Sequence, residues 1–217
     1  MQGITKDSSI GELTIHFPDK LIFGKGKLDT LSGELSRLAC KKVLIITIGP
    51  LLSRLQTIIG QLRKKSIEVQ IDTSIIQEPF FSDFKKLMDG ISAFNPDVVV
   101  GIGGGSVLDV CKLVAAQLEN EQPLEAYVGI GLLKGRKKRL ICLPATSGTG
   151  SEVSPNAILV DDADGQKKGI ISPWLVPDVV IVDPLLTLSV PSTITAATGI
   201  DALTHCLEAY TNKFAHP

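Results

Sequence analysis

The stretch VVVGIGGGSVLDVCK, residues 98–112, joins a predicted strand to a predicted helix. A run of β-branched apolar residues ends in glycines at positions 101 and 103–105, and Ser106 then opens a segment of helical length. Glycines allow a sharp turn and let a phosphate approach backbone N–H groups, while a helix N-terminus adds unpaired donors and a partial positive charge. The stretch therefore indicates a nucleotide site, in which Ser106 caps the helix or donates to a phosphate oxygen, or else a tight turn without a ligand.

The same alternation continues on both sides of this stretch. Apolar runs of strand length and segments of helical spacing follow each other at 42–48, 50–65, 67–73, 82–94, 96–105, 106–118, 139–144 and 177–184. Near-continuous Val, Ile and Leu strands separated by helices are typical of a parallel sheet covered on both faces. We therefore predict an α/β fold with a Rossmann-like parallel sheet and flanking helices, and we expect Ser82 or Asp83 to cap the helix at 82–94.

Three segments lie outside this alternation. Residues 13–31 predict two short strands and a turn, and residues 156–172 predict a hairpin that turns between Asp162 and Gly165. From Val190 the chain reads as helical, which indicates the start of an all-helical domain. A boundary near Pro184 divides the chain into a nucleotide-binding α/β domain, 1–184, and a first helical segment of a metal-binding domain, 185–217.

Composition restricts the function classes. The 217 residues are 44% hydrophobic, enough for a sizeable core, and the net charge of −1 gives no basic field for a nucleic acid. We expect KGRKKR, 134–139, to be a solvated loop. None of the four cysteines forms a C-x-x-C pair and no signal segment opens the chain, so we expect reduced thiols and a cytoplasmic protein. No apolar run reaches the roughly 20 residues that a membrane span needs.

Several common motifs are missing. The first predicted strand is followed by Gly49-Pro50 rather than G-x-G-x-x-G, and neither Gly24-Lys25 nor Gly26-Lys27 is followed by Ser or Thr, as a Walker A motif requires. No G-x-S-x-G elbow is present, so a serine hydrolase is poorly supported.

A second polar loop, LPATSGTGSEVS at 143–154, follows the strand at 139–144. In an open parallel sheet, ligands bind outside the carboxyl ends of the strands. This loop and the glycine loop both leave such ends, so both are expected to line one crevice. We expect Glu152 in the first turn of a following helix, where a carboxylate suits the helix dipole.

Asp201 and His205 are four residues apart in TGIDALTHCLEAY, 198–210. On a helix they would share a face, with Cβ atoms about 6 Å apart. The pair could grip a divalent cation, or it could form a plain Asp–His hydrogen bond. Apolar neighbours such as Ile200 and Leu203 predict a largely buried helix. We expect His16 in the N-terminal strands and His216 too far along the helix for the same ion.

Four segments taken together resemble the iron-containing (group III) alcohol dehydrogenases: GGGSVLDVCK (103–112), PATSGTGSEVS (144–154), VDPLLTLSVP (182–191) and TAATGIDALTHCLEAY (195–210). FGKGKLDTL (23–31) matches an early segment of that family, so the resemblance spans 23 to 217. It implies a nucleotide-binding α/β domain, an all-helical metal domain, and an active site in the cleft between them.

The resemblance also implies roles for individual residues. A pyrophosphate is bound at Gly103, Gly104, Gly105 and Ser106. Cofactor contacts come from Thr146, Thr149 and Lys168, with Lys167 as a rival for the lysine. Asp201 and His205 supply two of four metal ligands, and the other two are histidines further along the helical domain, before which this chain is expected to end. No catalytic side-chain base is identified.

From this resemblance we expect a metal-dependent NAD(P) alcohol dehydrogenase or aldehyde reductase that acts on a small alcohol or aldehyde, with Fe²⁺, or alternatively Zn²⁺, as the metal. A glycerol-dehydrogenase-like zinc enzyme and a non-catalytic nucleotide-binding fragment are the alternatives. A nucleic-acid or membrane partner is not expected, and a homo-oligomer is possible.

The chain departs from the family pattern at two places. The family often carries an Asp after its first strand that selects NAD. Here Ile48 or Gly49 takes that place, which admits NADP. Where the family has Pro-Asn-Pro, this chain has QEPFFSD (77–83), with Glu78 or Phe80 in place of the Asn.

Overall fold

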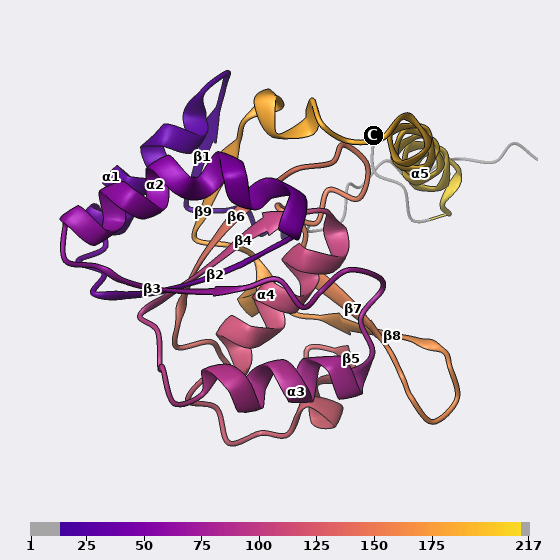
Figure 1. Ribbon diagram of the computed structural model, residues 1–217. Coiled ribbons are helices and arrows are strands. Elements are labelled where there is room, and N and C mark those ends of the chain that lie inside the picture. Colours follow the sequence, from indigo (N-terminus) through magenta and orange to yellow (C-terminus); the bar gives the residue numbers. More distant parts are fainter. Residues whose placement is uncertain (1–13, 214–217) are drawn as a thin grey trace, which may run out of the picture.

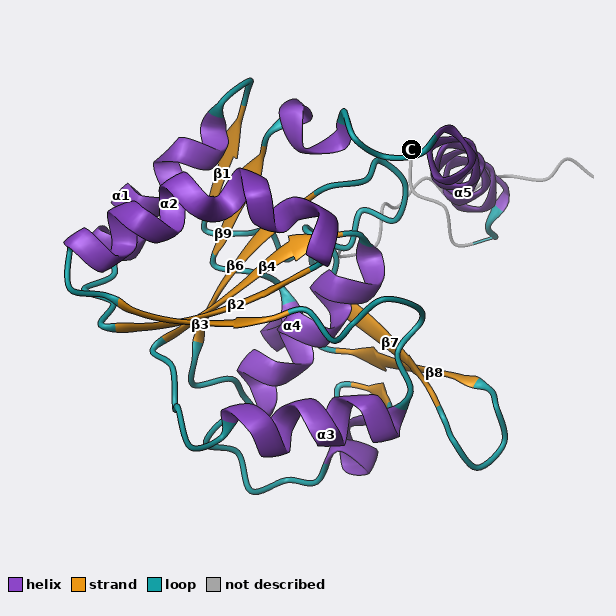
Figure 2. Cartoon of the chain, viewed as in Figure 1, coloured by secondary structure: helices purple, strands orange, loops and turns teal. Residues whose placement is uncertain are grey.

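The computed structural model describes residues 14–213, which build an open six-stranded parallel sheet with helices on both faces (Figures 1 and 2). The strand order is β1-β9-β6-β4-β2-β3, and every pairing in this sheet is parallel. The strands are β1 (Lys20–Phe23), β2 (Lys42–Thr47), β3 (Glu68–Asp72), β4 (Val98–Gly103), β6 (Arg139–Pro144) and β9 (Val179–Val182). The predicted Rossmann-like α/β fold is confirmed.

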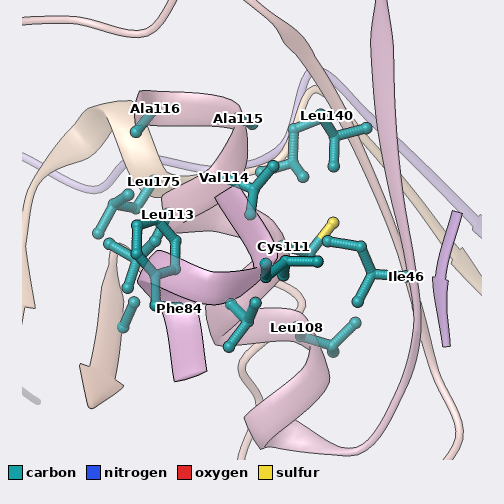
Figure 3. Packing of buried hydrophobic residues seen from close by; sticks show 14 of the residues in the cluster. Ile46, Phe84, Leu108, Cys111, Leu113, Val114, Ala115, Ala116, Leu140 and Leu175 are labelled. Atoms are coloured by element: carbon teal, nitrogen blue, oxygen red, sulfur yellow. The ribbon is translucent and has the colours of Figure 1, made fainter. Parts of the chain in front are cut away.

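The sheet separates two apolar cores. The helices are α1 (Leu31–Arg37), α2 (Leu52–Lys64), α3 (Phe81–Ile91), α4 (Gly105–Gln117) and α5 (Ser192–Thr211). One core joins α1 and α2 to the sheet, and the other joins α3 and α4 to the opposite face, where Cys111, Leu113 and Val114 of α4 are completely buried (Figure 3). Because β4 is buried along its whole length, its side chains are apolar on both faces rather than alternating.

The register of the sheet brings the carboxyl ends of three strands together. Thr47 at the end of β2 pairs with Ile102, and Gly103 at the end of β4 pairs with Pro144 at the end of β6. The hydroxyl of Thr47 also donates to the carbonyl oxygen of Ile102 at 2.8 Å. The loops that follow β2, β4 and β6 therefore leave the same edge of the sheet.

A small second sheet has the order β5-β8-β7. The predicted hairpin is present as β7 (Asn156–Val160) and β8 (Lys167–Ile171), which pair antiparallel, and β5 (Gly129–Ile130) adds a short parallel strand. Gly165 turns the hairpin with φ +67°, a conformation that favours glycine.

The hairpin turn also contacts the start of α3. Asp162 accepts hydrogen bonds from the backbone N–H and the hydroxyl of Ser82. The helix itself begins after Phe80, whose N–H donates to Asp83 at 3.1 Å. The predicted cap is therefore wrong: Asp83 closes the first turn from inside the helix, and Ser82 bonds to the hairpin.

The prediction of two strands over 13–31 is also wrong where the structure describes it. Only β1 forms, and a 3₁₀ turn over Lys27–Thr30 leads into α1. The reason is distant in sequence: the Asp183 carboxylate accepts the N–H groups of Gly26 and Leu28 at 3.0 and 2.9 Å. These bonds bend the chain out of the extended conformation just after β1.

The basic segment 134–139 is only in part the solvated loop that its composition predicts: Lys134, Lys137 and Arg139 are exposed, but Arg136 and Lys138 are not. Arg136 and Asp178 form an ion pair at 2.6 Å with both side chains only 10% exposed, and the buried Lys138 pairs with Glu119 at 2.6 Å. Two of its cations, Arg136 and Lys138, therefore serve to bind carboxylates of the fold. Within residues 14–213, no helix combines the length and apolar character needed to cross a bilayer.

Candidate functional site

The glycine loop is the junction of β4 and α4. Strand β4 ends at Gly103, Gly104 is the N-cap with φ −78°, and α4 begins at Gly105. No side chain caps this helix, and Ser106 lies in its first turn. Ser106 is therefore not the cap, and the backbone donors of the first turn are open to a ligand.

Close packing explains most of the glycines. A Cβ at Gly101 would lie 2.9 Å from Cys111, a Cβ at Gly103 would lie 2.8 Å from Val107, and a Cβ at Gly105 would lie 2.8 Å from Thr149. Gly104 differs, because its Cβ would meet Thr146 at an ordinary 3.5 Å. Neither its packing nor its φ demands glycine, so Gly104 is the position at which a missing side chain is best explained by an approaching ligand.

The second polar loop packs directly on the glycine loop. Ala145 N donates to the Gly103 carbonyl at 2.8 Å, and Thr149 contacts Gly105. The hydroxyl of Thr149 accepts a hydrogen bond from Ser151 N at 3.2 Å, which leaves its own proton free to donate. The expectation that the two loops lie together is confirmed. No helix follows this loop directly, and Glu152 lies in a turn instead of a first helical turn.

A cleft of about 270 Å³ opens between these loops, the hairpin and α5. Its lining residues are Glu78, Pro79, Gly105, Ser106, Asp109, Thr149, Ser151, Ser154, Asn156, Ile158, Lys167, Asp201 and His205. The cleft therefore collects backbone donors, hydroxyls, both signs of charge and the Asp–His pair.

Asp201 and His205 reach the cleft from α5, which stands apart from the two helical layers (Figure 1). The expected burial of this helix is wrong: α5 has no buried residue, and Ile200 and Leu203 are 64% and 54% exposed. The helix approaches the polar loop closely where its Thr198 meets Gly148: a Cβ at Gly148 would lie 2.6 Å from the Thr198 carbonyl oxygen.

The geometry of this pair fits two ligands of one cation. Asp201 Oδ1 and His205 Nε2 are 3.6 Å apart, too far for a good hydrogen bond. Two ligands about 2.1 Å from one tetrahedral ion would be roughly 3.4 Å apart. In the part of the chain that the structure describes, no cluster of three or more His, Cys, Asp or Glu completes a metal site. His16 lies at a different hollow beside Trp174, and His216 lies outside the described residues.

Comparison with known proteins assigns the family. The model of the family described as iron-containing alcohol dehydrogenase matches residues 18–184. This chain belongs to that family. It is 39% identical over 209 residues, 94% of its length, to long-chain-alcohol dehydrogenase 1 of Geobacillus thermodenitrificans. The chain spans about half the length, 52%, of this relative.

Solved structures of other enzymes share the fold. A 1,3-propanediol oxidoreductase superimposes with a TM-score of 0.87 at 31% identity, over 95% of this chain and 55% of its own. A sulfoacetaldehyde reductase from Bifidobacterium kashiwanohense, solved in complex with NAD⁺, gives a TM-score of 0.83 at 29% identity, over 95% of this chain and 56% of its own.

The two candidate lysines of the hairpin lie in different surroundings. Lys167 lines the cleft and pairs with Glu78 at 2.5 Å. Lys168 binds Asp164 at 2.6 Å, and this hydrogen bond raises its pKa. A cofactor contact by Lys168 stays a prediction, and the geometry favours Lys167 for it.

The two departures from the family pattern also have definite places. After β2 the chain continues through the half-buried Ile48 into a 3₁₀ turn that starts at Gly49, and neither residue offers a carboxylate. Of the two candidates for the missing Asn, Glu78 lines the cleft, whereas Phe80 is the N-cap of α3.

Sequence reasoning missed Lys112 and Asp109. The Lys112 side chain is completely buried, and that of Asp109 is 14% exposed at the wall of the cleft. The signal was present: an acidic and a basic residue three apart in the otherwise apolar segment SVLDVCKLVAA. Such a pair faces the same side of a helix, and on a buried helix it must find polar partners.

Proposed function

We propose that this chain supplies the nucleotide-binding half of a metal-dependent NAD(P)-linked alcohol dehydrogenase or aldehyde reductase that acts on small alcohols or aldehydes. The observation that carries the proposal is the cleft itself, where an uncapped helix N-terminus, the Thr149 hydroxyl and the Asp201–His205 pair face one space. Family membership and a relative solved with NAD⁺ support it.

The residues in and beside the cleft have separable tasks. The backbone N–H groups at Gly105 and Ser106 bind the pyrophosphate, with Gly104 leaving room for it. Thr149 in the cleft and Thr146 beside Gly104 donate hydrogen bonds from their hydroxyls to the cofactor, and Lys167 adds a positive charge at the cleft. A nicotinamide in this position supplies the hydride donor or acceptor.

Asp201 and His205 are placed to hold a divalent cation at the same cleft. Such a cation polarises the substrate oxygen and stabilises negative charge on it. The family description favours iron over zinc, although a carboxylate and an imidazole suit both. No side chain that lines the cleft is assigned as the general base. Asp201 and His205 are therefore assigned only to binding the cation.

We infer that NADP is accepted as well as NAD, because Ile48 and Gly49 place no carboxylate where a 2′-phosphate would be repelled. A cytoplasmic location is part of the proposal and is supported by Cys40, Cys111, Cys142 and Cys206, which are all free thiols.

The test is a titration with NADH and NADPH, followed by nicotinamide fluorescence, of the wild-type chain and Gly104→Ala. Because the fold has room for a Cβ at 104, we expect the variant to unfold at the wild-type temperature and to bind at least about tenfold more weakly. Gly90→Ala, in open space on α3, is the matched control and should bind as wild type. A folded wild-type chain that binds neither dinucleotide would contradict the proposal.

A further inference from the structure

The buried Lys112 ammonium is the centre of a polar cluster between α4 and the second loop. Its Nζ lies 2.8 Å from the Asn156 carbonyl, 3.1 Å from the Ser154 carbonyl, and 3.1 Å from the Ser151 hydroxyl. The Ser154 hydroxyl is also within 3.2 Å, and the Asp109 carboxylate is 3.8 Å away. One side chain of α4 thus reaches both the polar loop and the first residue of β7.

The protons of this cluster can be assigned to partners. The two carbonyl oxygens can only accept, so two ammonium protons go to Ser154 and Asn156, and the third goes to the Ser151 hydroxyl. The Ser151 hydroxyl then donates a hydrogen bond to one oxygen of Asp109, and the other oxygen accepts a hydrogen bond from Ile158 N at 3.0 Å.

The pKa values of the pair respond to burial. Burial lowers the pKa of Lys112, and the charge of Asp109 opposes that change. Burial raises the pKa of Asp109, against the pull of Lys112.

This cluster is connected to the face of the cleft through a short path. Ser151 N donates to the Thr149 hydroxyl at 3.2 Å, and Thr149 packs against Gly105 at the start of α4. Thr149 and Ser151 line the cleft, whereas the Lys112 side chain, 0% exposed, does not. Lys112 therefore contacts the loop from the buried side, whereas Thr149 and Ser151 of the loop line the cleft.

We propose that Lys112, paired with Asp109, is a positioning residue that holds the loop 145–154 against the glycine loop and thereby sets the affinity of the cleft for the dinucleotide. The effect on affinity rests on the proposed function, and the effect on the loop does not. A buried ammonium suits this task because replacing it leaves two carbonyl oxygens without donors, so the loop must move to find water.

The experiment compares Lys112→Met, which keeps the length of the side chain, with wild type by hydrogen–deuterium exchange and by NADH titration. We expect amides of 146–154 to exchange at least about tenfold faster in the variant, while amides of β2 keep wild-type protection. We expect the NADH dissociation constant to rise by about tenfold or more. Leu113→Ala, buried on the same helix away from the cleft, is the control for a general loss of stability and should leave both values near wild type.

Ser151→Ala provides the second variant. It removes the hydroxyl that joins Lys112 and Asp109 to the loop but keeps Ser151 N on Thr149 and the carbonyl partners of Lys112, so it should fold even if Lys112→Met does not. We expect a smaller effect in the same direction, and less than additive effects on NADH affinity in the double variant, because both residues act on one loop.

Two results would overturn the positioning role: unchanged exchange of 146–154 in both variants, or equal loosening of the loop and equal loss of affinity in Leu113→Ala. A wild-type chain that binds no dinucleotide would contradict the proposed function. The exchange data would then still decide whether Lys112 positions the loop.

Discussion

At Gly101, strand β4 and helix α4 approach so closely that a side chain has no space. A Cβ there would lie 2.9 Å from both Cβ and Sγ of the completely buried Cys111. We predict that Gly101→Ala lowers the free energy of unfolding by about 1–3 kcal/mol, the usual penalty of overpacking a core. Gly90→Ala, in open space within α3, should raise it by about 0.5–1 kcal/mol. Urea denaturation measures both, and two variants of equal stability would contradict the packing argument.

Because of Asp178, the free energy of unfolding depends on pH. Burial alone would raise the pKa of Asp178, but bonds from Arg136, Leu140 N and Arg139 hold it below its ordinary value. A carboxyl with a lowered folded pKa stabilises the fold above its unfolded pKa of about 3.9, and this contribution is lost as pH falls through the folded value.

We therefore predict that Asp178→Asn lowers the free energy of unfolding by about 3 kcal/mol at pH 7, because it leaves the Arg136 charge beneath the surface without its partner. The difference from wild type should shrink as pH falls below about 3.9. Urea denaturation at a series of pH values tests this, with Asp89→Asn on the exposed face of α3 as the control. A difference that is the same at every pH would contradict it.

At the level of single residues, the sequence predicted where the site lies better than it predicted why the glycines there are required. Gly105, Ser106, Thr149 and the Asp–His pair line the cleft, whereas Gly103, Gly104, Thr146 and Lys168 do not. The glycines, however, are required mainly by Cys111, Val107 and Thr149, which pack against them. Such contacts depend on the tertiary fold, so no local pattern could distinguish them from a phosphate contact. Lys112 could have been found from its polarity on an apolar helix.

Among the elements, α5 makes few contacts with the rest of the described chain. Its Thr198 carbonyl and Cα lie so near Gly148 that a Cβ there would be 2.6 and 3.0 Å away. We predict that Gly148→Ala separates the start of α5 from the polar loop and increases hydrogen exchange in 192–199 by about tenfold. Gly199→Ala, with open space around it on the same helix, should not increase it. Unchanged exchange in Gly148→Ala would show that this contact does not hold the helix.

The strands and helices of the sheet could be predicted because each apolar run has the length of one element and is bounded by Gly, Pro or charged residues. Two elements could not. Residues 24–30 turn because Asp183, far along the chain, accepts their N–H groups. The apolar residues of α5 predicted burial, but apolar spacing shows only which face a helix can bury and not what covers it.

For the molecule as a whole, the notable surface is that of α5, because it is apolar and exposed. Its exposed apolar side chains are Ile194, Ile200, Leu203, Leu207 and Tyr210. Apolar patches of this kind favour association, so we predict that the chain self-associates as its concentration rises.

The variant Ile200→Gln, Leu203→Gln, Leu207→Gln should be more nearly monomeric in size-exclusion chromatography with light scattering. Ile76→Gln, which replaces a single residue that is 82% exposed outside α5, is the control and should behave as wild type. A wild-type chain that is monomeric at every concentration would contradict the prediction.

The pairing of β1 with β9 has a consequence for biosynthesis. Lys20 pairs with Val179 and Phe23 pairs with Val182, and β9 also covers the outer edge of β6. While the ribosome is still making the residues between them, β1 has no strand to pair with and β6 has an open edge. Contacts between such distant segments form slowly and leave strand edges exposed in the meantime. The nascent chain therefore needs shielding from its neighbours until β9 has left the exit tunnel, and a stall before residue 179 leaves a chain that cannot complete its sheet.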